Sequence, residues 1–471
     1  MKKPLTLLLL ILSSGLFAQN DTVIFTTQGH FYYNQFPLWA VYSPLIDRMS
    51  RPYVYTASTD LGMVTFNISN LMAPVPVDTI TPAMLGNAKA SFLAQVGNLL
   101  FIATGNLQAA GERGGLSIYD ISNPLQPLLK DHWDSAAYTH GSAHVIINGN
   151  YAYLAALDDG VIILNISNVN NIQFVSQIQP TNIACLNSNH SRGLFLSGDT
   201  LLVANDCGGL RVINVSNPNA PAQMGAYLNT SSYGTGTPYY NHVYRIGDYA
   251  FIPVDYCGFE VDNVANPAAI TNVATWNPWN CSSNNWNGAD LHTNEIVSAM
   301  PTANVLMVSG GDSQVLAFDP TNPTQLRLMG AWGFPNTDSL GSWGVDVFGG
   351  LVALGYLRTP APFFSDHGGL QLLSWTLLTG EKENEMETGK LNLYPNPASE
   401  KCTIELPASP DKLFTIEIID VMGKTVSTEI ADPKFNGRTA EVNLNGLSAG
   451  IYSVRVSGEH LVYTGRIVKT N

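Results

Sequence analysis

The sequence predicts an all-β protein: a seven-bladed β-propeller of four-stranded blades, followed by a small C-terminal Ig-like β-sandwich. Three observations lead to this prediction. Short apolar runs recur in groups of four between Gly, Asn and Asp turns, these groups repeat every 45 to 56 residues, and a charged segment precedes a differently patterned tail. With 471 residues and only 12% charged residues, the chain can bury a large core.

The first residues predict export. Lys2 and Lys3 precede an apolar run over residues 7–17, and Ala18 supplies a small residue before a cleavage point. We therefore assign residues 1–18 to a signal peptide that is removed. No later stretch approaches the roughly 20 apolar residues of a spanning helix, so we expect no transmembrane segment.

The clearest repeat covers residues 144–179 and predicts strands at 144–147, 151–156, 161–166 and 173–179, here named a to d from the axis outward. An Asn-Ile-Ser-Asn turn, often with Pro, connects c to d. Because antiparallel strands alternate in direction, b–c turns and d-to-a connections share one face, the loop face. The repeats are anchored at Asn67, Asp120, Asn165, Asn214, Asn263, Asp319 and a degenerate Ser374.

The ends of the repeat array predict a closed ring. The seventh repeat stops after residues 369–375 without a fourth strand, whereas residues 21–29 form a strand without a repeat of their own. Placing this strand outermost in the last blade removes an exposed sheet edge. An ordinary N-terminal edge strand is the alternative. Since the first and seventh repeats are weak, six blades remain the alternative count.

The repeat sequences YAYLAALDDGVIILNIS (151–167) and GGLRVINVSNPNAPAQMG (208–225) resemble LVIVD repeats. That resemblance implies a secreted β-propeller over residues 21–378. It implies little about biochemical activity.

The tail forms a separate predicted module. Residues 379–390 are charged and lack a core pattern, which indicates a linker before the domain at 391–471. Ordered landmarks in this domain resemble the type A C-terminal sorting domain of the type IX secretion system. The resemblance implies transport through the periplasm and across the outer membrane by that machinery, removal of the tail, and secretion or display at the cell surface. The landmark residues are Tyr394, Pro395, Asn396, Pro397, Gly450, Tyr452 and Lys469.

Aromatic, His and Asp residues gather in segments that the repeat assigns to the loop face. Flat rings provide contact area and polar groups provide directional hydrogen bonds, so this composition suits a glycan or protein partner. Aromatic plugs between blades are the competing interpretation. The candidate ligand-binding residues are His144, His190, His242, His292, Tyr239, Tyr240, Trp286, Trp343, Asp366 and His367.

Metal binding is a second hypothesis for the same face. Four histidines near the axis could hold a metal ion. Asp158, Asp206 and Asp255 recur in b–c turns and could bind calcium, although such turns favour Asp in any case. No sequence motif indicates another cofactor.

Four cysteines share the loop face and allow three pairings. We favour Cys185 with Cys207 and Cys257 with Cys281, since each bond would join a long loop to a nearby turn. A Cys207–Cys257 bond across blades is the alternative.

Charge and motifs favour a binding or scaffold function over catalysis. The net charge of −14 and the absence of basic runs argue against a nucleic acid partner. No nucleophile elbow, zinc-protease helix or P-loop is present. The alternative is an extracellular hydrolase or lyase with acidic and His residues at the channel mouth, for example Asp290 with Asp366.

Overall fold

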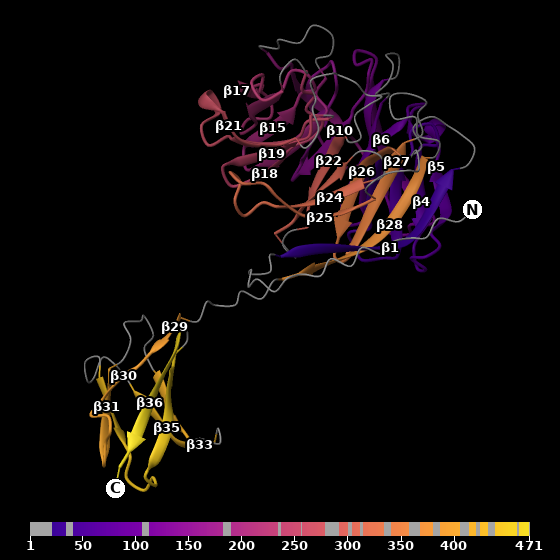
Figure 1. The fold of residues 1–471 in the computed structure, drawn as a ribbon. Coiled ribbons are helices and arrows are strands. Elements are labelled where there is room, and N and C mark those ends of the chain that lie inside the picture. Colours follow the sequence, from indigo (N-terminus) through magenta and orange to yellow (C-terminus); the bar gives the residue numbers. More distant parts are fainter. Residues whose placement is uncertain are drawn as a thin grey trace, which may run out of the picture. The chain divides into compact units, whose positions relative to one another are not determined.

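The computed structural model describes residues 21–33, 41–105, 113–181, 190–233, 237–255, 257–277, 292–299, 304–310, 314–333, 341–357, 368–379, 387–405, 414–420, 424–431, 439–458 and 461–470. The chain divides into two compact units. One is Asp21–Leu378 and the other contains the tail from Thr379 onward. Figure 1 shows that both are built from strands.

The first unit holds seven four-stranded antiparallel sheets in its described residues, and each is named here by its place in the chain. Sheet 1 contains β2 (Ser43–Ile46), β3 (Tyr53–Ala57), β4 (Met63–Asn67) and β5 (Val75–Ile80). Sheet 2 contains β6 (Ala90–Val96), β7 (Leu99–Thr104), β8 (Gly114–Asp120) and β9 (Leu128–Ser135). Sheet 3 contains β10 (His144–Asn148), β11 (Tyr151–Ala155), β12 (Val161–Asn165) and β13 (Gln173–Ile178).

Sheets 4 to 6 follow the same order. They are β14 (Gly193–Ser197), β15 (Thr200–Ala204), β16 (Leu210–Asn214) and β17 (Ala222–Tyr227), then β18 (Tyr244–Ile246), β19 (Tyr249–Pro253), β20 (Phe259–Asn263) and β21 (Thr271–Trp276), then β22 (Thr293–Ser298), β23 (Leu306–Gly310), β24 (Gln314–Asp319) and β25 (Arg327–Trp332). Two short 3₁₀ turns, η1 (Pro82–Leu85) and η2 (Pro267–Ala269), lie between strands.

Sheet 7 joins the two ends of the unit. It contains β26 (Gly341–Phe348), β27 (Leu351–Leu357), β28 (Gly368–Leu378) and, outermost, β1 (Thr22–Tyr33) from the start of the described chain. Strand β1 runs antiparallel to β28, with Val23 opposite Leu377 and, beyond a bulge, His30 opposite Gln371. Sheet 7 therefore ties segments more than three hundred residues apart in the sequence.

The first strands of the sheets form a closed ring around an axis. Each contacts the first strand of the next sheet, from β2 through β6, β10, β14, β18 and β22 to β26, and β26 contacts β2. Strands β11 and β12 are almost wholly buried, because neighbouring sheets cover both of their faces, whereas the outer strand β13 is half-exposed. This ring of sheets is a β-propeller.

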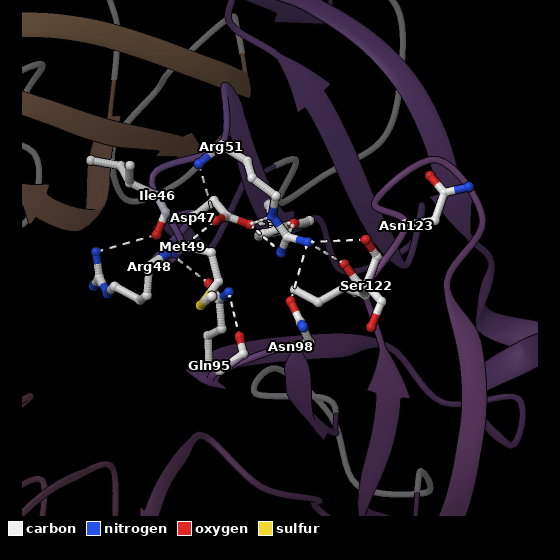
Figure 2. A network of polar contacts seen from close by, with 12 residues as sticks. Ile46, Asp47, Arg48, Met49, Arg51, Gln95, Asn98, Ser122 and Asn123 are labelled. Carbon is white, nitrogen blue, oxygen red and sulfur yellow. Dashed lines mark hydrogen bonds and ion pairs between the residues drawn. The ribbon is translucent and has the colours of Figure 1, made fainter.

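A polar network joins sheets 1 and 2 at turns opposite the loop face, and Figure 2 shows Arg51 of this network beside Asn98 and Ser122. The carboxylate of Asp47, fully buried, accepts from Arg51 Nη2 at 2.6 Å and from the Tyr55 hydroxyl at 2.7 Å. Arg51 Nη1 also donates to the Ile121 carbonyl in sheet 2, and Arg48 Nη2 pairs with Asp346 of sheet 7 at 2.5 Å. The network therefore supports the ring where its two ends meet.

The c–d turns on this second face, here called the turn face, stabilise themselves. In sheet 3, Asn165 Oδ1 accepts from the Ser167 amide at 2.9 Å, and Asn168 Oδ1 accepts from the Asn170 amide at 3.1 Å. Side chains that hydrogen-bond the backbone two residues on make Asx turns. Sheets 1 to 6 each repeat this first contact, from Asn67, Asp120, Asn165, Asn214, Asn263 and Asp319.

The tail unit contains a five-stranded and a three-stranded sheet. The strands are β29 (Glu387–Lys390), β30 (Asn392–Tyr394), β31 (Lys401–Glu405), β32 (Phe414–Ile419), β33 (Thr425–Ala431), β34 (Thr439–Asn443), β35 (Gly450–Ser457) and β36 (Leu461–Lys469). Strand β29 lies within the segment predicted as linker. It pairs in parallel with β36 through its backbone, which requires no apolar pattern in the sequence.

The tail landmarks meet around its last strand. Asn396 Nδ2 donates to the Arg466 carbonyl at 2.8 Å, and its Oδ1 accepts from the Val468 amide at 2.9 Å. Gly450 lies opposite Lys469, and the Tyr452 hydroxyl donates to the Ser448 carbonyl. Residues 394–397, the 450–452 segment and the terminal strand therefore belong to one structural unit.

Candidate functional site

The loop-face end of the axis is lined by residues from all seven sheets, and we call this set the axial mouth. Each lining residue lies within three residues of the start of its sheet's first strand, so the repeated backbone delivers one or two positions per sheet to the same point. The residues are Tyr42, Phe92, Ala143, His144, Arg192, Asn241, His242, Asn294, Glu295 and Trp343. Chemically these positions differ from one sheet to the next.

A constriction separates two cavities along the axis. The upper cavity, at the axial mouth, has a volume of about 30 Å³, which is room for one or two waters. The lower cavity has a volume of about 360 Å³ and reaches the turn-face ends of the inner strands at Arg48, Gln95 and Ser298. Four residues line both cavities and form the constriction: Phe92, His144, His242 and Glu295.

The two histidines of the constriction bond to each other. His144 Nε2 lies 2.8 Å from His242 Nε2, and the His144 ring packs on Phe92 with centroids 3.9 Å apart. Burial, together with the neighbouring His242, holds the pKa of His144 well below its usual value, and burial lowers the pKa of His242 to about 3. Both rings are therefore neutral at pH 7, one donating through Nε2 and the other accepting.

An ion pair borders the axial mouth in sheet 4. Arg192 Nε donates to Asp206 Oδ2 at 3.0 Å. Burial would lower the pKa of Arg192, but the Asp206 carboxylate and Tyr42 outweigh it and raise this pKa. Burial likewise would raise the pKa of Asp206, but Arg192 and His190 hold it below its usual value. Arg192 thus stays charged at the mouth.

Aromatic and amide groups complete the mouth. The rings of Tyr42 and Trp343 lie 5.0 Å apart, and Trp343 remains partly exposed. Asn241 Nδ2 donates to Asn294 Oδ1 at 3.0 Å, which fixes both amides. Burial and the nearby Asp346 raise the pKa of Glu295 well above its usual value, although its Oε2 accepts from the Val345 amide at 2.8 Å.

Other loop-face histidines join adjacent sheets. His190 Nε2 lies 2.9 Å from Asp158 Oδ1 of sheet 3, and its Nδ1 lies 3.3 Å from Asp206 Oδ2 of sheet 4. His292, fully buried, bonds through Nδ1 to Asp255 Oδ1 at 2.8 Å. The His190–Asp158 and His292–Asp255 pairs each join a b–c turn to the segment that begins the next sheet, so these contacts hold adjacent sheets together.

The structure brings together none of the predicted metal sets in its described residues. There, no group of three or more His, Cys, Asp or Glu side chains is arranged to hold a metal ion. Asp158, Asp206 and Asp255, the calcium candidates, are instead bonded to the histidines just described.

Tyr240 lies in the interior, although the sequence placed it with the ligand-binding residues. It is fully buried, and its hydroxyl donates to Glu260. Tyr233 donates to the same carboxylate at 2.5 Å and Asn229 at 3.0 Å. Tyr239 is half-buried and packs against the core between sheets 4 and 5. The loop after sheet 4 therefore folds inward at these positions.

Cys207 and Cys257 are both disulfide-bonded, and Cys402 in the tail is a free thiol. Cys185 and Cys281 lie outside the described residues, so the pairing stays a prediction. Trp286, Asp290, Asp366 and His367 also lie outside them.

Sequence reasoning missed Tyr42, Arg192, Asn294 and Glu295 as members of the axial mouth. The only sequence signal for these four residues is their position in the repeat. Each lies at, or within two residues of, the start of its sheet's first strand, where His144 and His242 were noticed for their chemistry. Aligning all seven repeats at that position would have found them.

The fold and axial site define a propeller-type protein built from repeats. Residues 89–135, 141–179 and 189–229 are LVIVD repeats. Residues 392–470 are a secretion system C-terminal sorting domain, of the type IX system. The protein is therefore exported to the cell surface or the outside by that machinery. Within the described ranges, no helix is long and apolar enough to cross a membrane.

Solved structures resemble the chain only distantly. They include the computationally designed Ika8 protein (TM-score 0.45, 11% identity, 76% of this chain, 94% of that one). A chain of the Mitotic Checkpoint Complex has a TM-score of 0.49 and 10% identity, and the match covers 79% of this chain and 94% of that one. The Cps50 (Swd1) β-propeller domain of Myceliophteria thermophila has a TM-score of 0.47 and 9% identity, and the match covers 74% of this chain and 98% of that one. The ring of sheets and the repeats establish the β-propeller fold. No curated protein matches the chain.

Proposed function

We propose that this exported propeller is a binding module that recognises a glycan at its axial mouth. The observation that carries the proposal is the convergence of one or two positions from every sheet, with different side chains, on a single point. A repeat that keeps its backbone but varies these side chains builds one asymmetric site. Such a site suits recognition of an asymmetric ligand.

The chemistry of the mouth favours a sugar. Trp343, which is partly exposed, offers flat apolar surface to the C–H face of a sugar ring, and Arg192, also partly exposed, offers a planar guanidinium group for paired hydroxyls. The upper cavity, at about 30 Å³, is too small to enclose a sugar. A glycan would therefore lie across the mouth, with a terminal unit against Trp343.

Binding is favoured over hydrolysis by the partners of the acidic groups. Asp158, Asp206 and Asp255 are engaged with His190, Arg192 and His292 in contacts that hold the sheets. Their carboxylates support the architecture of the mouth. The hydrolase or lyase alternative, with Asp290 and Asp366, depends on residues outside the described part of the chain.

A glycan array probed with the full chain tests the proposal. We expect saturable binding of particular glycans, weakened at least about tenfold by Trp343→Ala because the stacking surface is lost. Phe174→Ala is the matched control, since Phe174 is an exposed aromatic on an outer strand. Equal loss in both variants, or turnover of the bound glycan that His292→Ala or Asp366→Asn abolishes, would contradict the binding assignment.

A further inference from the structure

The lower cavity is a second candidate site, distinct from the axial mouth. Its volume of about 360 Å³ falls within the range of small-molecule sites. It begins at the constriction and follows the inner strands to Arg48, Gln95 and Ser298, which are partly exposed at the turn face. A ligand could therefore reach it from the face opposite the axial mouth.

The lower cavity is lined by more acidic than basic residues. Its acidic lining residues are Glu295 and Asp346, and its basic lining residue is Arg48. Arg48 pairs with Asp346 at 2.5 Å, and the Ile46 amide donates to the other oxygen of that carboxylate at 2.7 Å. The Asp346 charge is thus compensated. The carboxyl group of Glu295 accepts from the Val345 amide, and the residue is only 7% exposed.

Aromatic rings line the same cavity. Phe195 and Tyr244 lie 4.7 Å apart, at an angle of 59°, and both are only partly buried although they belong to inner strands. Phe92 lies at the constriction beside His144. Aromatic faces attract organic cations, and the attraction grows where water is excluded.

The histidine pair is neutral at the upper end of the cavity. The Nδ1 atoms of His144 and His242 are buried and have no hydrogen-bond partner among the described residues. Because these two atoms have no accessible surface, they do not face a ligand in the cavity.

We infer that the lower cavity binds an organic monocation carrying a primary ammonium group. The ammonium ion-pairs with Glu295, and the carbon chain lies against Phe92, Phe195 and Tyr244. Burial and Asp346 raise the pKa of Glu295, which agrees with a buried carboxyl group beside another acid. This inference does not depend on the glycan proposal.

Calorimetry on the full chain tests the inference with hexylammonium and its neutral analogue 1-hexanol. We expect hexylammonium to bind at least about tenfold more tightly than 1-hexanol, because only the cation pairs with Glu295. Glu295→Gln should remove this preference. Tyr244→Leu should weaken hexylammonium binding about threefold, whereas Phe174→Leu on the outer strand should not.

Two further measurements keep the outcomes distinct. The denaturant midpoint and the near-UV circular dichroism of Glu295→Gln show whether that variant still folds. Trp343→Ala should retain hexylammonium binding while losing the glycan, so each proposal can fail alone. Equal affinity for the cation and the alcohol, an unchanged preference in Glu295→Gln, or no hexylammonium binding up to about 10 mM would overturn the inference.

Discussion

The two faces of the propeller are stabilised in different ways. On the turn face, the c–d turns of sheets 1 to 6 bond within themselves through an Asx contact, and Gly149 in an a–b turn has no neighbouring atom within 4 Å of an added Cβ. On the loop face, Leu157 and Asp206 make isolated bridges to Ser191 and Tyr240 at the start of the next sheet. Turn-face structure is therefore local, whereas loop-face structure depends on the assembled ring.

The difference shows where a repeat can vary. Since the Asx turns fix the outer geometry in sheets 1 to 6, side chains at the opposite end can vary and build sheet-to-sheet contacts and an asymmetric mouth. The same difference predicts that matched substitutions on the two faces have unequal costs.

The largest effect is expected for Asp206→Ala on the loop face. Removing this carboxylate leaves Arg192 without its ion-pair partner, which should cost about 3–5 kcal/mol of unfolding free energy. Asp199→Ala, at an exposed a–b turn of the same sheet, should change stability by less than about 0.5 kcal/mol. Urea unfolding measures both, and similar costs would contradict the comparison.

The Asp206 effect should also depend on pH. Its pKa in the folded protein is lowered, so its stabilisation is present above the unfolded value of about 4 and is lost as the pH falls through the folded value. The difference between wild type and Asp206→Ala should therefore shrink in acid.

Two glycines in sheet 3 give a matched pair. Gly160, with φ of 75° in the b–c turn, would place a Cβ 2.3 Å from the Ile178 carbonyl oxygen. Gly160→Ala should cost about 2–4 kcal/mol from backbone strain and this clash. Gly149→Ala, with φ of 55° and open space, should cost about 1 kcal/mol from strain alone. Equal shifts in the chemical denaturation midpoint would show that the loop face is no more constrained.

A buried acidic pair between sheets 4 and 5 should respond to pH in the opposite sense. Burial and Glu260 raise the pKa of Asp262 well above its usual value, so the folded chain retains a proton that the unfolded chain releases above about pH 4. Wild-type stability therefore falls as the pH rises toward the folded pKa. Asp262→Asn lacks this linkage, and its advantage over wild type should be on the order of 1 kcal/mol larger at pH 8 than at pH 5. Parallel stability curves would contradict this assignment.

The smallest effect belongs to the turn face itself. Asn165→Ala removes the acceptor of the Ser167 amide and should cost about 1 kcal/mol. Asn150→Ala, an exposed neighbour on the same face, should be close to neutral. Glycan binding should be unchanged in both variants, and a loss of binding would show that the two faces are coupled.

Local signals explain how much of the fold the sequence could provide. The Asn-x-Ser turns, Gly turns and apolar runs are written within each repeat, so strands such as β11 and β12 and the propeller class could be predicted. Strand β29 could not, since its pairing with β36 uses backbone groups and leaves no apolar pattern.

The site was harder to predict from the sequence than the fold, for a physical reason. His144 and His242 could be recognised as rim residues, but their direct bond depends on the approach of sheets 3 and 5 across the axis. The sequence does not distinguish Tyr240 from a surface aromatic, because the residue is buried through a contact between its hydroxyl and the Glu260 carboxylate of sheet 5. Contacts between sheets depend on how the ring assembles, so no residue spacing in the sequence predicts them.

The most direct test of the account is a crystal structure of the full chain with its strongest-binding glycan. We expect the glycan at the axial mouth, with one sugar ring against Trp343 and hydroxyl groups within hydrogen-bond distance of Arg192 and Asn241. A glycan seated on the c–d turns or on the outer strands, with the axial mouth unoccupied, would contradict it.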